Sequence, residues 1–110
     1  MNSRIYLASP HMSGEEMKYI KEAFDTNWIA PLGENVNNFE KDICDYTGAK
    51  YATALSSGTA ALHLGLKALG VKEGDIVFCQ SLTFSASANP ILYEKAIPVF
   101  IDSNYETWNM

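Results

Sequence analysis

Small hydroxyl-bearing residues and one glycine stand together at residues 56–59, in the order Ser-Ser-Gly-Thr. They follow a short apolar run, Tyr51–Leu55, and precede an apolar segment with helical spacing. A turn of this kind directs several backbone N–H groups towards one point, where the helix dipole adds about half a positive charge. Ser56 or Ser57 can cap the helix, and Gly58 lets the backbone approach an anion closely. The stretch predicts phosphate binding, although an ordinary strand-to-helix turn with a serine cap fits it equally well.

The elements around this turn alternate between strand and helix from residue 51 onwards. Strands are predicted at Tyr51–Leu55, Asp75–Cys79 and Ile97–Ile101, and helices at Thr59–Leu69 and Ser85–Lys95. Pro90 predicts a kink or a late start in the last of these helices. The βαβαβ order predicts an α/β fold whose parallel sheet is covered on both faces.

Residues 1–50 are predicted to form a helical lead-in to this α/β region, which occupies residues 51–110. Ser13 and Glu16 have the spacing of a capping box, with Ser13 as the N-cap of a first helix that ends near Asp25. A second helix ends at Gly48, which suits a left-handed cap. Apolar residues share one face of each helix, and those of the second helix are expected to point inward: Met17, Ile20 and Phe24 in the first, and Val36, Phe39, Ile43 and Tyr46 in the second.

Three segments whose residues could bind a ligand are expected at one edge of the sheet. In α/β sheets ligands bind outside the carboxyl ends of the strands. That edge would gather residues 56–59, residues 81–85 and Asp102. A phosphate-binding turn, the aromatic ring of Phe84 and a carboxylate would therefore share one side, which favours a cofactor or nucleotide site.

Composition narrows the possible classes of protein. With 110 residues, 47% of them hydrophobic and 19% charged, the chain is predicted to form at most one globular domain. Its net charge of −5 argues against nucleic acid and anionic membrane surfaces as partners. No apolar run approaches the ~18 residues of a membrane span, and no signal-like apolar core is present, so a cytoplasmic location is expected. Cys44 and Cys79 lack the spacing of metal ligands, so we expect reduced packing residues and no metal site.

The identity of the ligand follows from the motifs that are missing. No G-x-G-x-x-G follows the first strand and no Walker A loop is present, which disfavours dinucleotides and nucleoside triphosphates. A single phosphate suits one short turn, and a planar ring attached to it could lie against Phe84. Pyridoxal phosphate has that shape.

Two segments, residues 56–64 (Ser-Ser-Gly-Thr-Ala-Ala-Leu-His-Leu) and residues 83–89 (Thr-Phe-Ser-Ala-Ser-Ala-Asn), resemble the DegT/DnrJ/EryC1/StrS family of sugar aminotransferases. Further matches in the same order are residues 27–33, Phe39-Glu40, residues 46–48 and residues 98–102. Within the family, residues 7–12, 18–20 and 29–34 resemble transaminases that make a UDP-linked 4-amino-4,6-dideoxy-N-acetylglucosamine, a bacillosamine precursor. The resemblance covers nearly the whole chain.

The resemblance implies the N-terminal portion of the type I pyridoxal-phosphate-dependent aminotransferase fold and a homodimer. It implies transfer of an amino group, usually from glutamate, to the keto group of a nucleotide-linked 4-keto-6-deoxy sugar for surface polysaccharide or glycan biosynthesis. A UDP-linked sugar is favoured among these substrates.

The resemblance also implies roles for individual residues. Ser57, Gly58 and Thr59 would bind the cofactor phosphate, and Phe84 would stack on the pyridine ring. Residues of the apolar loop would lie near the sugar-nucleotide entrance, namely Trp28, Ile29 and Pro31. Phe84 as a core aromatic and Trp28 as a packing residue remain open alternatives. His63 is expected to be a packing residue, and Asp102 is expected to have a structural or edge role.

No catalytic residue is expected within this chain. Its seven lysines each fit a helix surface or a turn, and the family's Schiff-base lysine and pyridine-binding aspartate are expected beyond residue 110. The chain ends in a turn after a strand, so we expect the front part of a longer protein, inactive and poorly folded by itself. Two alternatives stay open: a dehydratase of the same family with histidine in place of the lysine, and a non-catalytic phosphate-binding module with a flavodoxin-like sheet.

Overall fold

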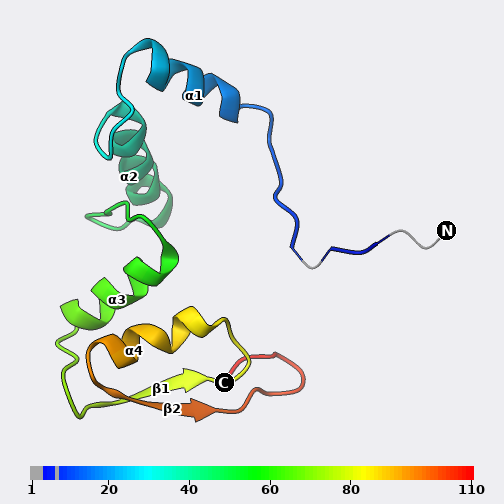
Figure 1. The fold of residues 1–110 in the computed structure, drawn as a ribbon, viewed down its shortest axis with the longest axis vertical. Coiled ribbons are helices and arrows are strands. Elements are labelled where there is room, and N and C mark those ends of the chain that lie inside the picture. Colours follow the sequence, from blue (N-terminus) through cyan, green and yellow to red (C-terminus); the bar gives the residue numbers. More distant parts are fainter. Residues whose placement is uncertain (1–3, 7) are drawn as a thin grey trace. The chain divides into compact units, whose positions relative to one another are not determined.

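The computed structural model describes residues 4–6 and 8–110 and divides the chain into two compact units, Met1–Ala54 and Leu55–Met110 (Figure 1). Leu7, the first residue of the matched segment 7–12, lies outside the described residues.

The first unit contains two helices joined by an apolar loop. Helix α1 spans Glu16–Asp25 and helix α2 spans Glu34–Thr47, so the predicted end of the first helix is confirmed. Gly48 adopts φ 75° and donates its N–H to the Cys44 carbonyl at 2.9 Å, which confirms the left-handed cap.

The capping box at the start of α1 is only half formed. The Glu16 carboxylate accepts hydrogen bonds from the backbone N–H groups of Ser13 at 2.6 Å and Gly14 at 2.9 Å. Bonds from its own backbone N–H and from that of Ser13 lower the pKa of Glu16 to about 2. The prediction of Ser13 as N-cap is wrong, because Glu15 occupies that position and the Ser13 hydroxyl accepts from the Glu15 N–H instead. Gly14, at φ 100°, makes the intervening turn.

The apolar stripe of α2 does not form a core in this unit. Tyr46 is 91% exposed and Phe39 is 57% exposed, and neither α1 nor α2 contains a buried residue. The expectation that this stripe points inward is therefore wrong, because among the described residues of the unit no apolar surface packs closely enough over it to bury it. A hydrogen bond links the two helices instead: Asn35 Nδ2 in α2 donates to the Tyr19 carbonyl in α1 at 3.3 Å.

The second unit is a small α/β layer. Helix α3 (Gly58–Ala68) precedes strand β1 (Ile76–Gln80), and the 3₁₀ turn η1 (Ser85–Ser87) and helix α4 (Asn89–Tyr93) lead to strand β2 (Ile97–Ile101). The strands pair in parallel, as predicted, from Ile76 opposite Ile97 to Gln80 opposite Ile101. Figure 1 shows α4 lying along the sheet and α3 beside α4.

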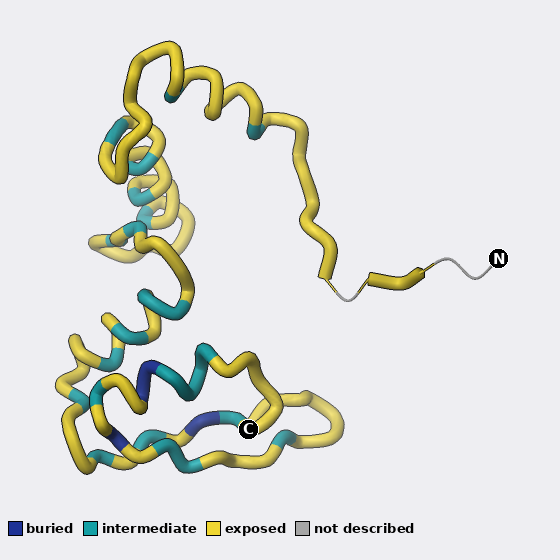
Figure 2. The backbone as a smooth tube through the Cα atoms, viewed as in Figure 1, coloured by how far each residue is buried: buried dark blue, intermediate teal, exposed yellow. Residues whose placement is uncertain are grey.

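The core of this unit is small. Cys79, Ile91 and Ala96 are buried, and the partly buried apolar residues around them are Leu66, Val71, Val77 and Ala88. Figure 2 shows this burial confined to α4, β1 and the residue before β2. The burial of Cys79 agrees with its predicted packing role.

Three predictions about the α/β region, residues 51–110, need correction or refinement. Tyr51–Leu55 is not a strand, because it pairs with no other segment among the described residues; instead, the Ala54 N–H donates to Glu40 Oε1 at 2.8 Å. The described sheet therefore has two strands. The helix expected over Ser85–Lys95 splits into η1 and a late α4, with Pro90 in its first turn, which confirms the late start.

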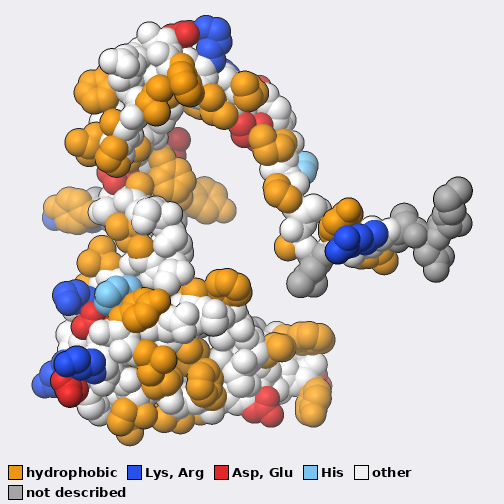
Figure 3. All heavy atoms as spheres, in the orientation of Figure 1, with side chains coloured by type: hydrophobic (Ala, Val, Ile, Leu, Met, Phe, Trp, Pro, Cys, Tyr) orange, Lys and Arg blue, Asp and Glu red, His pale blue; other side chains and the backbone are white. Residues whose placement is uncertain are grey.

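Only one face of the described sheet is covered. Along β1, Val77 is half-buried and Cys79 is buried, whereas Ile76 and Phe78 are 62% and 63% exposed. The expectation of a sheet covered on both faces is thus wrong for the described residues. Figure 3 shows hydrophobic side chains at the surface of each unit. In the described part of the chain, no helix is both long enough and apolar enough to cross a bilayer.

Candidate functional site

The turn before α3 is shaped by Ser57. This residue has an extended backbone, with φ −164° and ψ 160°, and its hydroxyl accepts the Ala60 N–H at 3.1 Å. Its carbonyl accepts the Ala61 N–H, also at 3.1 Å. Ser57 is therefore the N-cap of α3, one of the two serines that the sequence offered for that role.

The two N–H groups between the cap and Ala60 remain available. Within residues 4–6 and 8–110, neither the Gly58 nor the Thr59 N–H has a protein acceptor. A Cβ atom built on Gly58 would meet nothing within 4 Å, and the Gly58 backbone is not in the left-handed region. Because neither packing nor backbone strain within the chain requires a glycine there, the open space suits an incoming group. Two free donors, an open approach and the positive end of the helix fit a phosphate.

Phe84 stands at the surface of the segment that contacts α3. Its side chain is 79% exposed, so the described residues do not form a core around it. Phe84 caps η1, whose residues pack against α3, and its carbonyl accepts the Ser87 N–H at 2.9 Å. The structure thus places α3 and the segment that follows Phe84 in one unit, and η1 contacts α3.

The carboxyl ends of both strands border a hollow of about 370 Å³. Ser81 and Leu82, after β1, line it together with Asp102 and further residues after β2: Ser103, Asn104, Tyr105 and Trp108. The Gln80 side chain ties the second loop down, because it donates to Ser103 Oγ at 3.0 Å and to the Trp108 carbonyl. Asp102 Oδ1 accepts the N–H of Ser103 at 2.8 Å, which is the kind of structural role expected of it.

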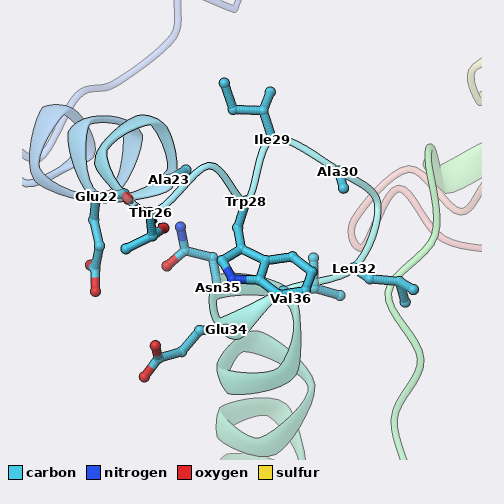
Figure 4. Close-up of a pocket in the computed structure, with 11 residues that line it drawn as sticks. Glu22, Ala23, Thr26, Trp28, Ile29, Ala30, Leu32, Glu34, Asn35 and Val36 are labelled. Atoms are coloured by element: carbon cyan, nitrogen blue, oxygen red, sulfur yellow. Dashed lines mark hydrogen bonds between the residues drawn. The ribbon is translucent and has the colours of Figure 1, made fainter.

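A second hollow, of about 380 Å³, lies in the first unit around the apolar loop. Trp28 and Ile29 line it, whereas Pro31 does not. Figure 4 shows the Trp28 ring against the first turn of α2, beside Asn35 and Val36, with Ile29 pointing away from it. Trp28 also packs over Gly33, where φ is 140° and a Cβ would approach Trp28 Cβ to 3.4 Å. Trp28 therefore has a packing role and still keeps 57% of its surface exposed.

A polar cluster between α3 and α4 was not found from the sequence. His63 Nε2 lies 2.6 Å from Glu94 Oε1, and Lys67 Nζ lies 3.6 Å from the same oxygen. The hydrogen bond from His63, followed by the charge of Lys67, lowers the pKa of Glu94 despite its partial desolvation. His63 does face its neighbours, as expected. No local pattern connects it with a carboxylate 31 residues away.

The lysines that the structure pairs with acids agree with the surface positions predicted for them. Lys21, Lys41, Lys67 and Lys95 each form an ion pair with an Asp or Glu and have side chains 67–74% exposed. Among the described residues, no group of three or more His, Cys, Asp and Glu side chains is arranged to hold a metal ion.

The sequence relatives of this chain include proteins named as an aminotransferase and as GDP-perosamine synthases. The family model of the DegT/DnrJ/EryC1/StrS aminotransferase family matches residues 10–110. EpsN of Bacillus subtilis (strain 168), which carries the name of a pyridoxal phosphate-dependent aminotransferase, is 64% identical over 110 residues, which are 100% of this chain and 28% of that protein. The GDP-perosamine synthase of Escherichia coli O157:H7 is 45% identical over 101 residues, covering 92% of this chain and 28% of the relative.

A solved structure agrees with this grouping. The structure of a GDP-4-keto-6-deoxymannose-3-dehydratase with a trapped PLP–glutamate geminal diamine matches this chain with a TM-score of 0.84 at 27% identity, over 97% of this chain and 29% of that one. The predicted fold class, an N-terminal portion of the type I aminotransferase fold, is thereby confirmed. The chain spans a little over a quarter of the length of the curated relatives named above, 28% in each case. From its sequence and its fold, the chain belongs to the DegT/DnrJ/EryC1/StrS aminotransferase family.

Proposed function

We propose that the protein containing this chain is a pyridoxal phosphate-dependent aminotransferase that acts on a nucleotide-linked sugar, and that this chain supplies its phosphate cradle. One observation carries the proposal: among the residues that the structure describes, the N–H groups of Gly58 and Thr59 at the N-terminus of α3 have no acceptor, and the space in front of Gly58 is open. Membership of the family and the names of its relatives support it.

Each residue of the cradle has a separate task in this proposal. The Gly58 and Thr59 N–H groups bind the phosphate, and the Thr59 hydroxyl adds a further donor. Ser57 holds the turn open, because its oxygen already accepts the Ala60 N–H at 3.1 Å while its own proton remains free to donate. Phe84 covers one face of the cofactor ring, which its 79% exposure leaves accessible. The cofactor itself supplies the electron sink for chemistry at the amino-bearing carbon.

The substrates we propose are glutamate, as amino donor, and a nucleotide-linked 4-keto-6-deoxy sugar, as acceptor. The matched segments 18–20 and 29–34 favour a UDP-linked sugar, although the names of the perosamine synthase and of the dehydratase refer to GDP-linked sugars. The hollow lined by Trp28 and Ile29 is proposed to border the sugar-nucleotide entrance, with Pro31 shaping the loop from outside the hollow. We further propose a cytoplasmic homodimer that serves surface polysaccharide or glycan biosynthesis.

The chain provides binding groups and no catalytic group. We propose that the Schiff-base lysine and the aspartate that pairs with the pyridine nitrogen lie in the part of the protein beyond residue 110. This chain by itself would then have no transferase activity.

A dehydratase of the same family is the second candidate, favoured by the structural match to the GDP-4-keto-6-deoxymannose-3-dehydratase. The residue after the family's serine-rich loop discriminates the two: lysine supports the aminotransferase and histidine supports the dehydratase. In an assay with glutamate and the keto sugar, an amino sugar product supports the first and a deoxygenated keto sugar supports the second.

The cradle is tested by a matched pair of glycine substitutions in the complete protein. Gly58→Val places a side chain where the phosphate would approach, whereas Gly65→Val adds the same side chain to the same helix, also with nothing within 4 Å of its Cβ. We expect Gly58→Val to weaken binding of pyridoxal phosphate, followed by its visible absorbance, by about a hundredfold, since two charge-assisted hydrogen bonds are disturbed. Gly65→Val should leave binding within about threefold. Equal binding by both variants would refute the cradle.

A further inference from the structure

The cluster between α3 and α4 joins two elements through a mostly buried carboxylate. The Glu94 side chain is 13% exposed, and its Oε1 meets His63 Nε2 at 2.6 Å and Lys67 Nζ at 3.6 Å. The His63 ring also stands edge-on to Tyr93, with centroids 5.3 Å apart. A carboxylate this far from water needs such partners, because losing one leaves a poorly solvated charge. The cluster is therefore a specific contact between the two helices.

This polar contact helps to fix the position of α3, which apolar packing alone holds only weakly. No residue of α3 is buried. Leu66 packs against the core but is itself only partly buried. His63, Leu66 and Lys67 lie at i, i+3 and i+4, which places them on the side of α3 that faces α4. Packing of Leu66 limits how far the helices separate, and the bond from His63 to Glu94 limits rotation of α3 about its own axis.

The two helices carry the two halves of the proposed cofactor site. His63 stands five residues after Gly58 on one rigid helix, roughly 7.5 Å along its axis. Phe84 begins the segment that runs through η1 into α4, and Glu94 follows the end of that helix. A rotation of α3 relative to α4 would therefore move the free N–H groups of Gly58 and Thr59 relative to the Phe84 ring.

We propose that His63 is a positioning residue for pyridoxal phosphate: its hydrogen bond to Glu94 fixes the spacing between the phosphate-binding N–H groups and the aromatic ring. This inference rests on the proposed function of the cradle. His63 acts through α3 and touches neither the phosphate nor the ring.

The test compares two ligands in the complete protein. Pyridoxal phosphate spans both halves of the site, whereas inorganic phosphate contacts only the N–H groups and competes for them. His63→Leu removes the bond to Glu94, and we expect it to weaken binding of pyridoxal phosphate by about tenfold. The inhibition constant of inorganic phosphate should stay within about twofold of the unsubstituted protein, because the cradle itself is unchanged.

Two further variants separate positioning from general stability. His63→Gln places an amide N–H near the position of Nε2 and should restore binding to within about threefold. Lys67→Leu removes the longer contact to the same oxygen and serves as the matched control, with a change below about twofold. Circular dichroism checks folding; if His63→Leu fails to fold, Glu94→Gln carries the same expectations.

Three results would overturn the inference: unchanged binding of pyridoxal phosphate in His63→Leu, an equal loss for both ligands, or no recovery in His63→Gln. Failure of the proposed function looks different. In that case Gly58→Val would match Gly65→Val, or the unsubstituted protein would bind no pyridoxal phosphate, and the positioning role would fall with it.

Discussion

The two units of the chain are held together by different means. The unit Leu55–Met110 buries Cys79, Ile91 and Ala96 between its strands and helices, whereas α1 and α2 of the unit Met1–Ala54 bury no residue. Both units have strongly apolar helix faces, so composition does not explain the difference. In the second unit the βα connection returns the chain onto its own sheet, which gives the apolar residues a surface to pack against. An amphipathic pattern determines which face of a helix is apolar. The order of the elements along the chain determines whether another apolar surface packs against that face.

The largest effect that tests this comparison is expected in the core of the second unit. Ile91 is 2% exposed, and Ile91→Ala should lower the free energy of unfolding of the protein that contains this chain by about 2–4 kcal/mol through lost burial and a new cavity. Urea titration followed by circular dichroism measures the change. Tyr46→Ala, at a position 91% exposed, should change it by less than about 0.5 kcal/mol. Similar costs for the two would mean that the units do not differ as described.

Gly33 offers a local test in the first unit. Its φ of 140° and the 3.4 Å approach of its Cβ position to Trp28 Cβ both oppose a side chain. Gly33→Ala should therefore destabilise the loop before α2 by about 1–2 kcal/mol, seen as a loss of helicity and a change in Trp fluorescence. Gly65→Ala is the control, since it lies within α3 with open space around its Cβ, and it should raise helicity slightly. A gain of helicity in Gly33→Ala would contradict the strained geometry.

The two serines at helix starts should respond differently to alanine. Ser57 caps α3 by accepting the Ala60 N–H, so Ser57→Ala should lower the free energy of unfolding by about 1 kcal/mol. Ser13 is not the N-cap of α1, and Glu16 can still accept from the backbone N–H groups of residues 13 and 14 after Ser13→Ala. The cost of that change should stay below about 0.5 kcal/mol. Thermal unfolding of both variants compares them directly, and a larger cost at Ser13 would restore it as the true cap.

The smallest expected effect is the loss of stability at acidic pH. The pKa of Glu16 is lowered from 4.5 to about 2, so its contribution to the start of α1 is present above pH 4.5 and is lost as the pH falls towards 2. The pKa of Glu94 is lowered by its hydrogen bond from His63, and its contribution in the second unit is likewise lost in acid. Side-chain carboxyl titration by NMR measures both. Glu16→Gln should remove the first of these pH dependences and leave the second, whereas persistence of both would contradict the assignment.

Local signals in the sequence predicted much of this architecture. Gly48, Ser57 and Pro90 mark a helix end, a cap and a late helix start, because each acts through its own backbone or its nearest neighbours. The parallel pairing of β1 with β2 also followed, since a helical crossover between apolar strands permits it.

The errors concern features that depend on distant parts of a chain. Tyr51–Leu55 has the apolar character of a strand, yet a strand exists only where another strand supplies hydrogen bonds. Tyr46 matches a helical stripe, yet its burial requires a facing surface. For the candidate site, the cap and the free N–H groups at Gly58 and Thr59 were predictable, whereas the link from His63 to Glu94 appears only once α3 and α4 lie together.

The bare face of β1 has a consequence for biosynthesis. Ile76 and Phe78 stand uncovered beside a strand edge, a combination that invites strand addition from another nascent chain. While the chain is being synthesised, these apolar side chains would be open to contact with other nascent chains. We therefore expect conditions that prolong the exposure of this face during synthesis to increase aggregation and the demand for chaperones.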